Sequence, residues 1–70
     1  MTMKFKSIYV SPRARLAFDI RKGATYQADK IGNQISVRVP IGRLVIKSQG
    51  ERFMSRSMTG ELLVAWEQVT

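Results

Sequence analysis

The residues of this chain that could do chemistry are mainly cationic, because 12 Lys and Arg stand against 5 Asp and Glu. The formal net charge is therefore +7 over 70 residues. A surplus of this size in a short chain favours binding of an anionic partner over catalysis. Five of the cations lie on neighbouring segments and form the candidate nucleic-acid-binding set: Arg38, Arg43, Lys47, Arg52 and Arg56.

Catalysis has few residues to draw on. The chain contains no His and no Cys, so it lacks the commonest general base, and neither a disulfide nor a zinc site of the usual kind can form. No acid–base pair or metal site is recognisable in the spacing of the carboxylates Asp19, Asp29, Glu51, Glu61 and Glu67. We therefore predict a protein that is not an enzyme and that uses no metal or cofactor.

The elements that must position the cations are predicted to be strands. Residues 34–39 alternate between polar and apolar side chains, as a half-buried strand does. The next segment, Val39-Pro40-Ile41-Gly42, has Pro at the second and Gly at the fourth position of a type I turn. A further strand is then expected to begin at Leu44.

A two-residue hairpin loop is predicted at Gly32-Asn33, because Gly supplies the positive φ that a type II′ turn needs at its first central position. Pairing outward from this loop brings the apolar side chains of both strands to one face. The expected cross-strand pairs are Ile31 with Gln34, Ala28 with Val37, and Tyr26 with Val39.

The preceding segment gives a conflict of register. Leu16, Phe18 and Ile20 alternate like the inward side of a strand, but a tight turn at Lys22-Gly23 would set Ile20 on the wrong face. We therefore expect a strand here, followed by a bulge or a wider loop over residues 21–24, in which Gly23 takes the unusual backbone angles.

Near the end of the chain, a turn at Thr59-Gly60 would set Phe53 opposite Trp66 in a last hairpin. Residues 62–66 also fit one face of a short helix, and strand is the favoured interpretation. The chain is thus predicted to be one domain over residues 1–70, all-β, built as a small antiparallel barrel of five to six strands with a short C-terminal helix as the alternative ending.

Four segments carry a resemblance: residues 20–26, residues 35–39, Gly42-Arg43, and residues 50–53. With a Lys-Gly-x-x-Tyr opening at residues 22–26 and a Glu-x-Phe close at residues 51–53, the chain resembles the small Src-homology-3-like domains of phage and prophage genomes. The resemblance implies a phage or mobile-element accessory protein. Such domains are frequently acidic, so the arginines of this chain depart from the pattern, and no partner is carried over.

Aromatic residues decide between two modes of nucleic-acid binding. Single-strand binders usually add aromatic platforms to their charge. Here Phe18, Tyr26, Phe53 and Trp66 are assigned to the core by register, and Tyr9 and Phe5 remain as stacking candidates for which a core role is favoured. We therefore expect DNA or RNA to be bound through its phosphates and its shape, with the five cations on a solvated strand face as the alternative interpretation.

A second hypothesis comes from the last hairpin, where Met54, Met58 and Leu63 are candidate protein-interface residues. The chain would then bind and modulate a host protein through a mixed basic and apolar surface. The alternative is that Met54 or Leu63 closes an end of the barrel. A homodimer through the same hairpin is compatible with either function.

The compartment is predicted from what the sequence lacks. The chain has no apolar run of the length that a membrane helix needs, and residues 4–12 do not resemble a signal peptide. With no Cys, the chain fits a reducing environment. We expect a cytoplasmic, soluble protein with no membrane partner.

Overall fold

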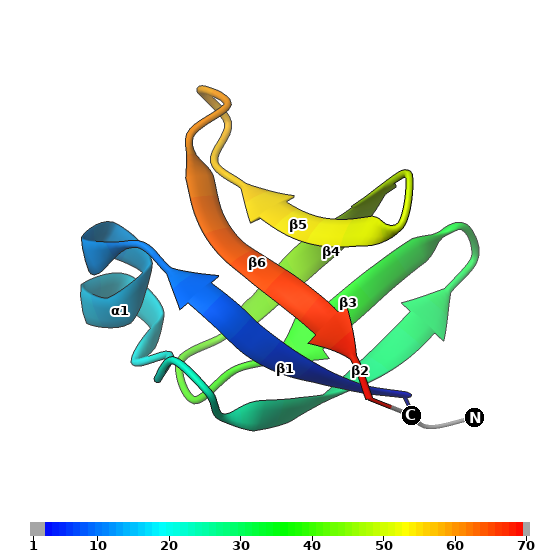
Figure 1. The fold of residues 1–70 in the computed structure, drawn as a ribbon, viewed down its shortest axis with the longest axis horizontal. Coiled ribbons are helices and arrows are strands. Elements are labelled where there is room, and N and C mark those ends of the chain that lie inside the picture. The colour runs from blue at the N-terminus through cyan, green and yellow to red at the C-terminus, as the bar shows by residue number, and fades with distance from the viewer. Residues whose placement is uncertain (1–2, 70) are drawn as a thin grey trace.

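Six antiparallel strands close into a barrel in the order in which they occur along the chain, and β6 pairs with β1 (Figure 1). The computed structural model describes residues 3–69, except for the side chain of Gln49. Its elements are β1 (Met3–Val10), α1 (Pro12–Phe18), β2 (Thr25–Ile31), β3 (Gln34–Arg38), β4 (Arg43–Gln49), β5 (Arg52–Arg56) and β6 (Leu62–Gln68). The predicted all-β fold and small antiparallel barrel are confirmed, with six strands.

The β2–β3 hairpin has the predicted register. Ala28 pairs with Val37 and Ile31 pairs with Gln34, and both Ala28 and Val37 are completely buried. In the loop, Gly32 has a φ of 61°, whereas Asn33 does not have a positive φ. A type II′ turn requires this combination, because only its first central residue lies in the left-handed region.

The predicted strand over residues 16–20 is wrong, because residues 16–18 belong to the helix α1 and Asp19 caps its C-terminus. The Ser11 hydroxyl caps the helix by accepting a hydrogen bond from the Ala14 N–H at 3.1 Å, and Pro12 occupies the first turn. A capping Ser followed by Pro starts a helix efficiently, and this local signal outweighs a short alternation of apolar residues. Leu16 consequently points to solvent with 84% of its surface exposed.

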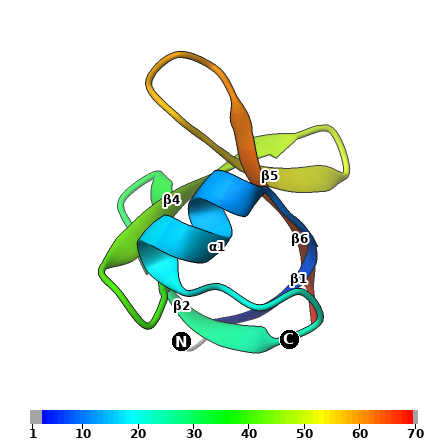
Figure 2. The same cartoon turned by 90° about the vertical axis from the view of Figure 1, so that its left-hand side faces the viewer.

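The helix α1 lies across one end of the barrel (Figure 2). Ala14, on its inner side, is completely buried, and so is Ile20 just after the helix. The alternative of a short C-terminal helix is also wrong, because residues 62–68 form the strand β6. Strand, the favoured interpretation of residues 62–66, is confirmed, and the helix lies near the N-terminus of the chain instead.

The loop over residues 21–24 is wide, as predicted, and Gly23 has a φ of 87°. Hydrogen bonds connect this loop to β1 at the buried residue Ser7. The Ser7 hydroxyl donates to the Arg21 carbonyl at 2.6 Å, the Ser7 N–H donates to the Ala24 carbonyl at 3.0 Å, and the Gly23 N–H donates to the Ser7 carbonyl at 2.8 Å.

Aromatic side chains from β1, β5 and β6 pack together in the barrel core. Trp66 lies opposite Phe53 as predicted, and the ring of Phe53 packs edge-on against Phe5 with a centroid distance of 5.1 Å. The indole N–H of the buried Trp66 donates to the Ser55 hydroxyl at 2.9 Å, which in turn donates to the Val45 carbonyl at 3.0 Å. This chain of hydrogen bonds ties β4, β5 and β6 together from the inside of the barrel.

Candidate nucleic-acid interface

Alternation along β4 places its cations on the outside of the barrel. Leu44 and Ile46 are buried, whereas Arg43, Val45 and Lys47 are exposed. Across the β3–β4 ladder, Arg43 pairs directly with Arg38, so two positive side chains stand opposite one another on the outer surface. Like charges in this position destabilise a sheet unless something else compensates them.

A depression on the outer surface, the basic notch, brings two further cations together. Lys47 and Arg56 line this notch of about 320 Å³, together with Val45, Ser57, Met58 and Gly60. The β4–β5 ladder runs from Gln49 with Arg52 to Lys47 with Met54. After the Lys47–Met54 pair, the Ser55 hydroxyl donates to the Val45 carbonyl and so joins β5 to β4 on the inside of the barrel. The basic notch lies on the outside of the same two strands.

Arg56 is oriented by hydrogen bonds. One terminal nitrogen of its guanidinium donates to the Gly60 carbonyl at 3.0 Å, and the other lies 3.6 Å from the sulfur of Met54. Arg donates through five N–H groups, so these contacts leave donors for a ligand. The guanidinium is therefore held at the edge of the notch with hydrogen-bonding capacity to spare.

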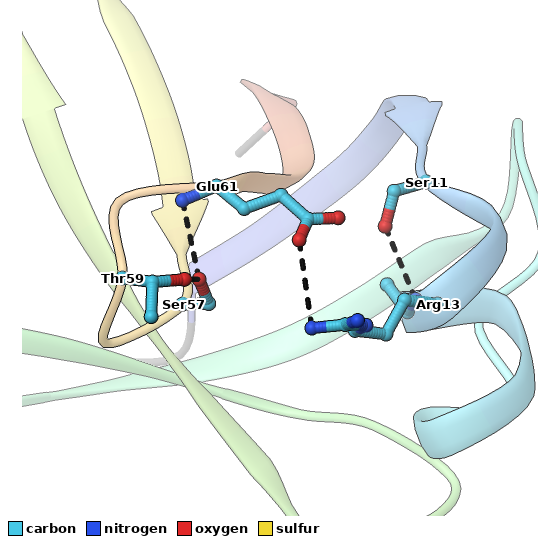
Figure 3. Close-up of polar contacts among 6 residues, drawn as sticks. Ser11, Arg13, Ser57, Thr59 and Glu61 are labelled. Atoms are coloured by element: carbon cyan, nitrogen blue, oxygen red, sulfur yellow. Dashed lines mark hydrogen bonds and ion pairs between the residues drawn. The ribbon is translucent and has the colours of Figure 1, made fainter.

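The β5–β6 loop, which forms one wall of the notch, is held by polar contacts (Figure 3). The hydroxyls of Ser57 and Thr59 lie 2.8 Å apart, and the Glu61 N–H donates to the Ser57 hydroxyl at 3.1 Å. The Glu61 carboxylate reaches Arg13 of α1 at 3.6 Å. Both ionic side chains are largely exposed, so this pair orients the loop more than it stabilises the fold.

Arg52 lies at the other end of β5 and lines a second depression, the apolar groove, of about 430 Å³. The remaining walls of this groove come mainly from β1, β5 and β6, and they include Ile8, Tyr9, Met54, Leu62 and Ala65. Most of the residues that line the groove are apolar, and Arg52 is the charged residue among them.

Arg38 is partly compensated by a carboxylate. Its Nε lies 2.9 Å from Asp29 of β2, and more than half of the Arg38 side chain is exposed. An exposed ion pair of this kind contributes at most about 1 kcal/mol. The outer faces of β3, β4 and β5 themselves carry no acidic residue, because Gln34–Arg38, Arg43–Gln49 and Arg52–Arg56 contain neither Asp nor Glu.

The five predicted cations thus lie on the outside of three consecutive strands, the basic face, defined as Arg38, Arg43, Lys47, Arg52 and Arg56. The three predicted protein-interface residues do not lie on one surface. Met58 is fully exposed in the β5–β6 loop and Met54 lines the apolar groove, but Leu63 is a core residue with 6% exposure. A bulge between Ser55 and Arg56 shifts the register there, so that both Leu63 and Val64 are buried.

The exposure of Tyr9 was not predicted from the sequence. Of the two stacking candidates, Phe5 is completely buried, whereas Tyr9 is 45% exposed on the barrel surface. The cause is a bulge between Ser7 and Tyr9, which changes the register of β1 against β6. Alternation alone predicts Tyr9 on the same face as Phe5 and Ser7, so the sequence pattern carries no signal for this change.

A third depression, of about 620 Å³, lies beside the end of α1 and is lined by Arg15, Arg21 and Lys22 together with Asp19. Asp19 ends the helix with a φ of 54°. Its carboxylate offsets part of the positive charge of these three cations.

Two further properties bear on the site. Within residues 3–69, no three carboxylates lie close enough together to hold a metal ion. The helix that the structure describes, α1, has seven residues, and no described helix is long and apolar enough to cross a membrane.

Fold and site together define a small closed β-barrel with one strongly basic outer face. Comparison of the chain with family models, with curated proteins and with solved structures finds no match. The resemblance to Src-homology-3-like phage domains therefore stays a prediction, and the function is argued from the site.

Proposed function

We propose that this protein is a non-enzymatic nucleic-acid-binding protein that contacts phosphates through the basic face. The observation that carries the proposal is the direct pairing of Arg38 with Arg43 on the outer surface of β3 and β4. Asp29 offsets the charge of Arg38 only in part, and no carboxylate of β3 or β4 faces Arg43. A polyanion reduces the remaining repulsion by placing phosphates beside both guanidinium groups. Release of counterions from the nucleic acid adds a favourable, salt-dependent contribution.

The distribution of the other cations supports the proposal. Lys47 and Arg56 share the basic notch, and the strands of the basic face contain no carboxylate. Four of its five cations are arginines, whose planar guanidinium donates two hydrogen bonds to one phosphate. An accessory role in a phage or mobile element, in the cytoplasm, is added from the sequence resemblance and composition.

The test is fluorescence anisotropy of labelled DNA and RNA across a salt series, with a double variant and a matched control. Arg38→Glu with Arg43→Glu and Lys4→Glu with Lys22→Glu both lower the formal charge by four, but Lys4 and Lys22 lie outside the basic face. We expect the first variant to bind much more weakly than the wild type and the second to retain most of the affinity. The magnitude of the log–log salt slope should fall by about 2 for the first variant, because two phosphate contacts are lost.

Circular dichroism and thermal unfolding of both variants check that each remains folded. Equal affinity of the wild type and a folded Arg38→Glu, Arg43→Glu variant contradicts the proposal. Equal losses in the two double variants would reduce the effect to net charge and contradict it as well.

Binding of a host protein is the second candidate function, and the exposure of Met58 favours it. This side chain is fully exposed in a loop that hydrogen bonds hold in place, and it borders the basic notch. An apolar side chain so presented can anchor a protein partner whose acidic surface meets the cations. A stoichiometric protein complex that survives nuclease treatment and is lost in Met58→Ser would support this function, and light scattering would reveal a homodimer.

A further inference from the structure

Tyr9 is displayed on the barrel surface by a local irregularity of β1. The register of β1 against β6 shifts between Ser7 and Tyr9, and both Ile8 and Tyr9 are 45% exposed. Two consecutive apolar side chains on the outside of a strand break the ordinary alternation of a barrel. Bulges of this kind redirect side chains and are frequent beside functional sites.

Tyr26, unlike Tyr9, has partners for both its ring and its hydroxyl. Tyr26 packs edge-on against Trp66 with a centroid distance of 6.1 Å, and its hydroxyl accepts a hydrogen bond from the Arg21 N–H at 3.0 Å. Within residues 3–69, Tyr9 has neither a ring–ring contact nor a hydrogen bond to its hydroxyl. Its ring is therefore free to meet a ligand.

The strand register connects Tyr9 to the basic face. Tyr9 pairs with Ala65, Ala65 pairs with Met54, and Met54 pairs with Lys47. This row crosses β1, β6, β5 and β4, and neighbouring strands are about 4.8 Å apart. The small side chain of Ala65 lies next to Tyr9 in the apolar groove, and Arg52 lines the same groove.

We propose that the apolar groove holds an unstacked base against Tyr9, while Arg52 and Lys47 contact the adjoining phosphates. The ligand of the basic face is then single-stranded nucleic acid. The inference rests on the proposed function and adds the ligand class to it. In a duplex the faces of the bases are covered by their neighbours in the stack, so only a single strand can present a base to Tyr9.

The charge and shape of the apolar groove favour this occupant. The groove combines apolar walls with Arg52, and none of the residues that line it is acidic. Its volume of about 430 Å³ is within the range of small-molecule sites. A nucleotide supplies both a flat ring for the apolar walls and a negative charge for the arginine.

The experiment compares Tyr9→Ala with Tyr9→Phe on a labelled single strand of about 12 nucleotides and on the duplex of the same sequence, within the usual size range of such sites. We expect Tyr9→Ala to weaken single-strand binding by about 5- to 150-fold, the range for loss of one stacked base. Its affinity for the duplex and the salt slopes should stay unchanged. Tyr9→Phe keeps the ring and should bind the single strand like the wild type.

A second apolar position controls for general effects of removing exposed surface. Ile41 is 55% exposed and lies outside the groove, so Ile41→Ala should leave both affinities unchanged. Thermal unfolding confirms that the Tyr9 variants remain folded.

Each result discriminates. Unchanged single-strand affinity in a folded Tyr9→Ala variant overturns the inference, and so does an equal loss on single strand and duplex. A groove that holds a protein segment gives the first of these results. If Arg38→Glu with Arg43→Glu abolishes binding while Tyr9→Ala does not, the proposed function stands and the base site fails; no binding by the wild type overturns both.

Discussion

The two halves of the barrel surface differ in which charged residues face one another across neighbouring strands. On the half formed by β6, β1 and β2, Lys6 pairs with Glu67, so opposite charges face one another across a ladder. On the half formed by β3, β4 and β5, Arg38 pairs with Arg43. The strands β3, β4 and β5 thus carry five of the 12 cations and no carboxylate of their own, and Arg38 is offset in part by Asp29 of the neighbouring β2.

This difference separates two uses of a surface. Opposite charges across strands stabilise a small barrel, whose core is too small to give a large margin of stability. Like charges across strands lower the stability and raise the local positive potential, which attracts a polyanion. The comparison indicates that the basic face is kept at some cost to folding, and the following variants test how each half of the barrel is stabilised.

The largest effect is expected from Ser55→Ala, which breaks the internal support of the basic half. The variant leaves the Trp66 N–H and the Val45 carbonyl without their shared partner inside the barrel. Burying unsatisfied groups should lower the free energy of unfolding by about 1–3 kcal/mol. Urea unfolding, followed by the fluorescence of the single tryptophan, measures the change.

Ser36→Ala is the matched control, since Ser36 makes no hydrogen bond through its side chain within the described residues 3–69. It should change the free energy of unfolding by less than about 0.5 kcal/mol. Equal urea midpoints for Ser55→Ala and the wild type would show that the hydrogen-bonded chain does not support β4 and β5.

Arg43→Glu converts the basic half to the arrangement of the other half. An opposite charge across from Arg38 should raise the free energy of unfolding by about 0.2–1 kcal/mol. The same variant should weaken nucleic-acid binding about tenfold, because a phosphate contact becomes a repulsion. Urea unfolding and anisotropy on one preparation measure both, with Arg43→Gln expected between the variant and the wild type.

The opposite signs of these two effects are the critical result for Arg43→Glu. A variant that lost stability and affinity together would indicate that Arg43 has a structural role and would remove the argument from like charges.

Glu67→Lys makes the reverse conversion on the other half. It sets a second cation across from Lys6 and should lower the free energy of unfolding by about 0.2–1 kcal/mol at low salt. The loss should shrink at high salt, where exposed charges are screened. Unfolding at two salt concentrations gives the measurement, Glu67→Gln is the neutral control, and a salt-independent loss would point to packing instead of charge.

Asp29→Asn should have the smallest effect. It releases Arg38 from its ion pair, which is exposed and contributes at most about 1 kcal/mol to stability. Nucleic-acid binding should tighten about two- to threefold, because the local positive potential rises. Anisotropy at low salt detects the change, and weaker binding would mean that Asp29 holds Arg38 in the geometry that the phosphate needs.

Turn chemistry made much of the fold predictable. Gly32-Asn33 determined the β2–β3 register, and Thr59-Gly60 correctly predicted Phe53 opposite Trp66. Gly32-Asn33 joins β2 and β3 directly, so its residue types fix which side chains face each other. The β5–β6 loop is longer, spanning residues 57–61, and the ladder shifts register between Ser55 and Arg56, so the Phe53–Trp66 pair is correct although the turn is wider than Thr59-Gly60. The strand predicted around Leu16 was wrong, because the helix-start signal at Ser11 and Pro12 outweighs three alternating apolar residues.

The candidate site was predictable in its cations and not in its apolar part. Arg43 and Lys47 could be assigned to the outside, since strict alternation holds along β4. Tyr9 and Leu63 could not be assigned, because bulges interrupt the ladders beside them and change which face a residue occupies. A bulge results from the fit between two strands, and a single strand's sequence does not encode it.

Closure of the barrel by β1 and β6 determines when the core can form during synthesis of the chain. Phe5 pairs with Gln68, so the seam joins residues from opposite ends of the described chain. Until β6 has been synthesised, β1 and β5 each present an unpaired edge, and the Trp66 indole has not entered the core. Pairing over such a long sequence separation is slow, about milliseconds to seconds for small barrels, so the nascent chain completes its core only after translation of its last strand.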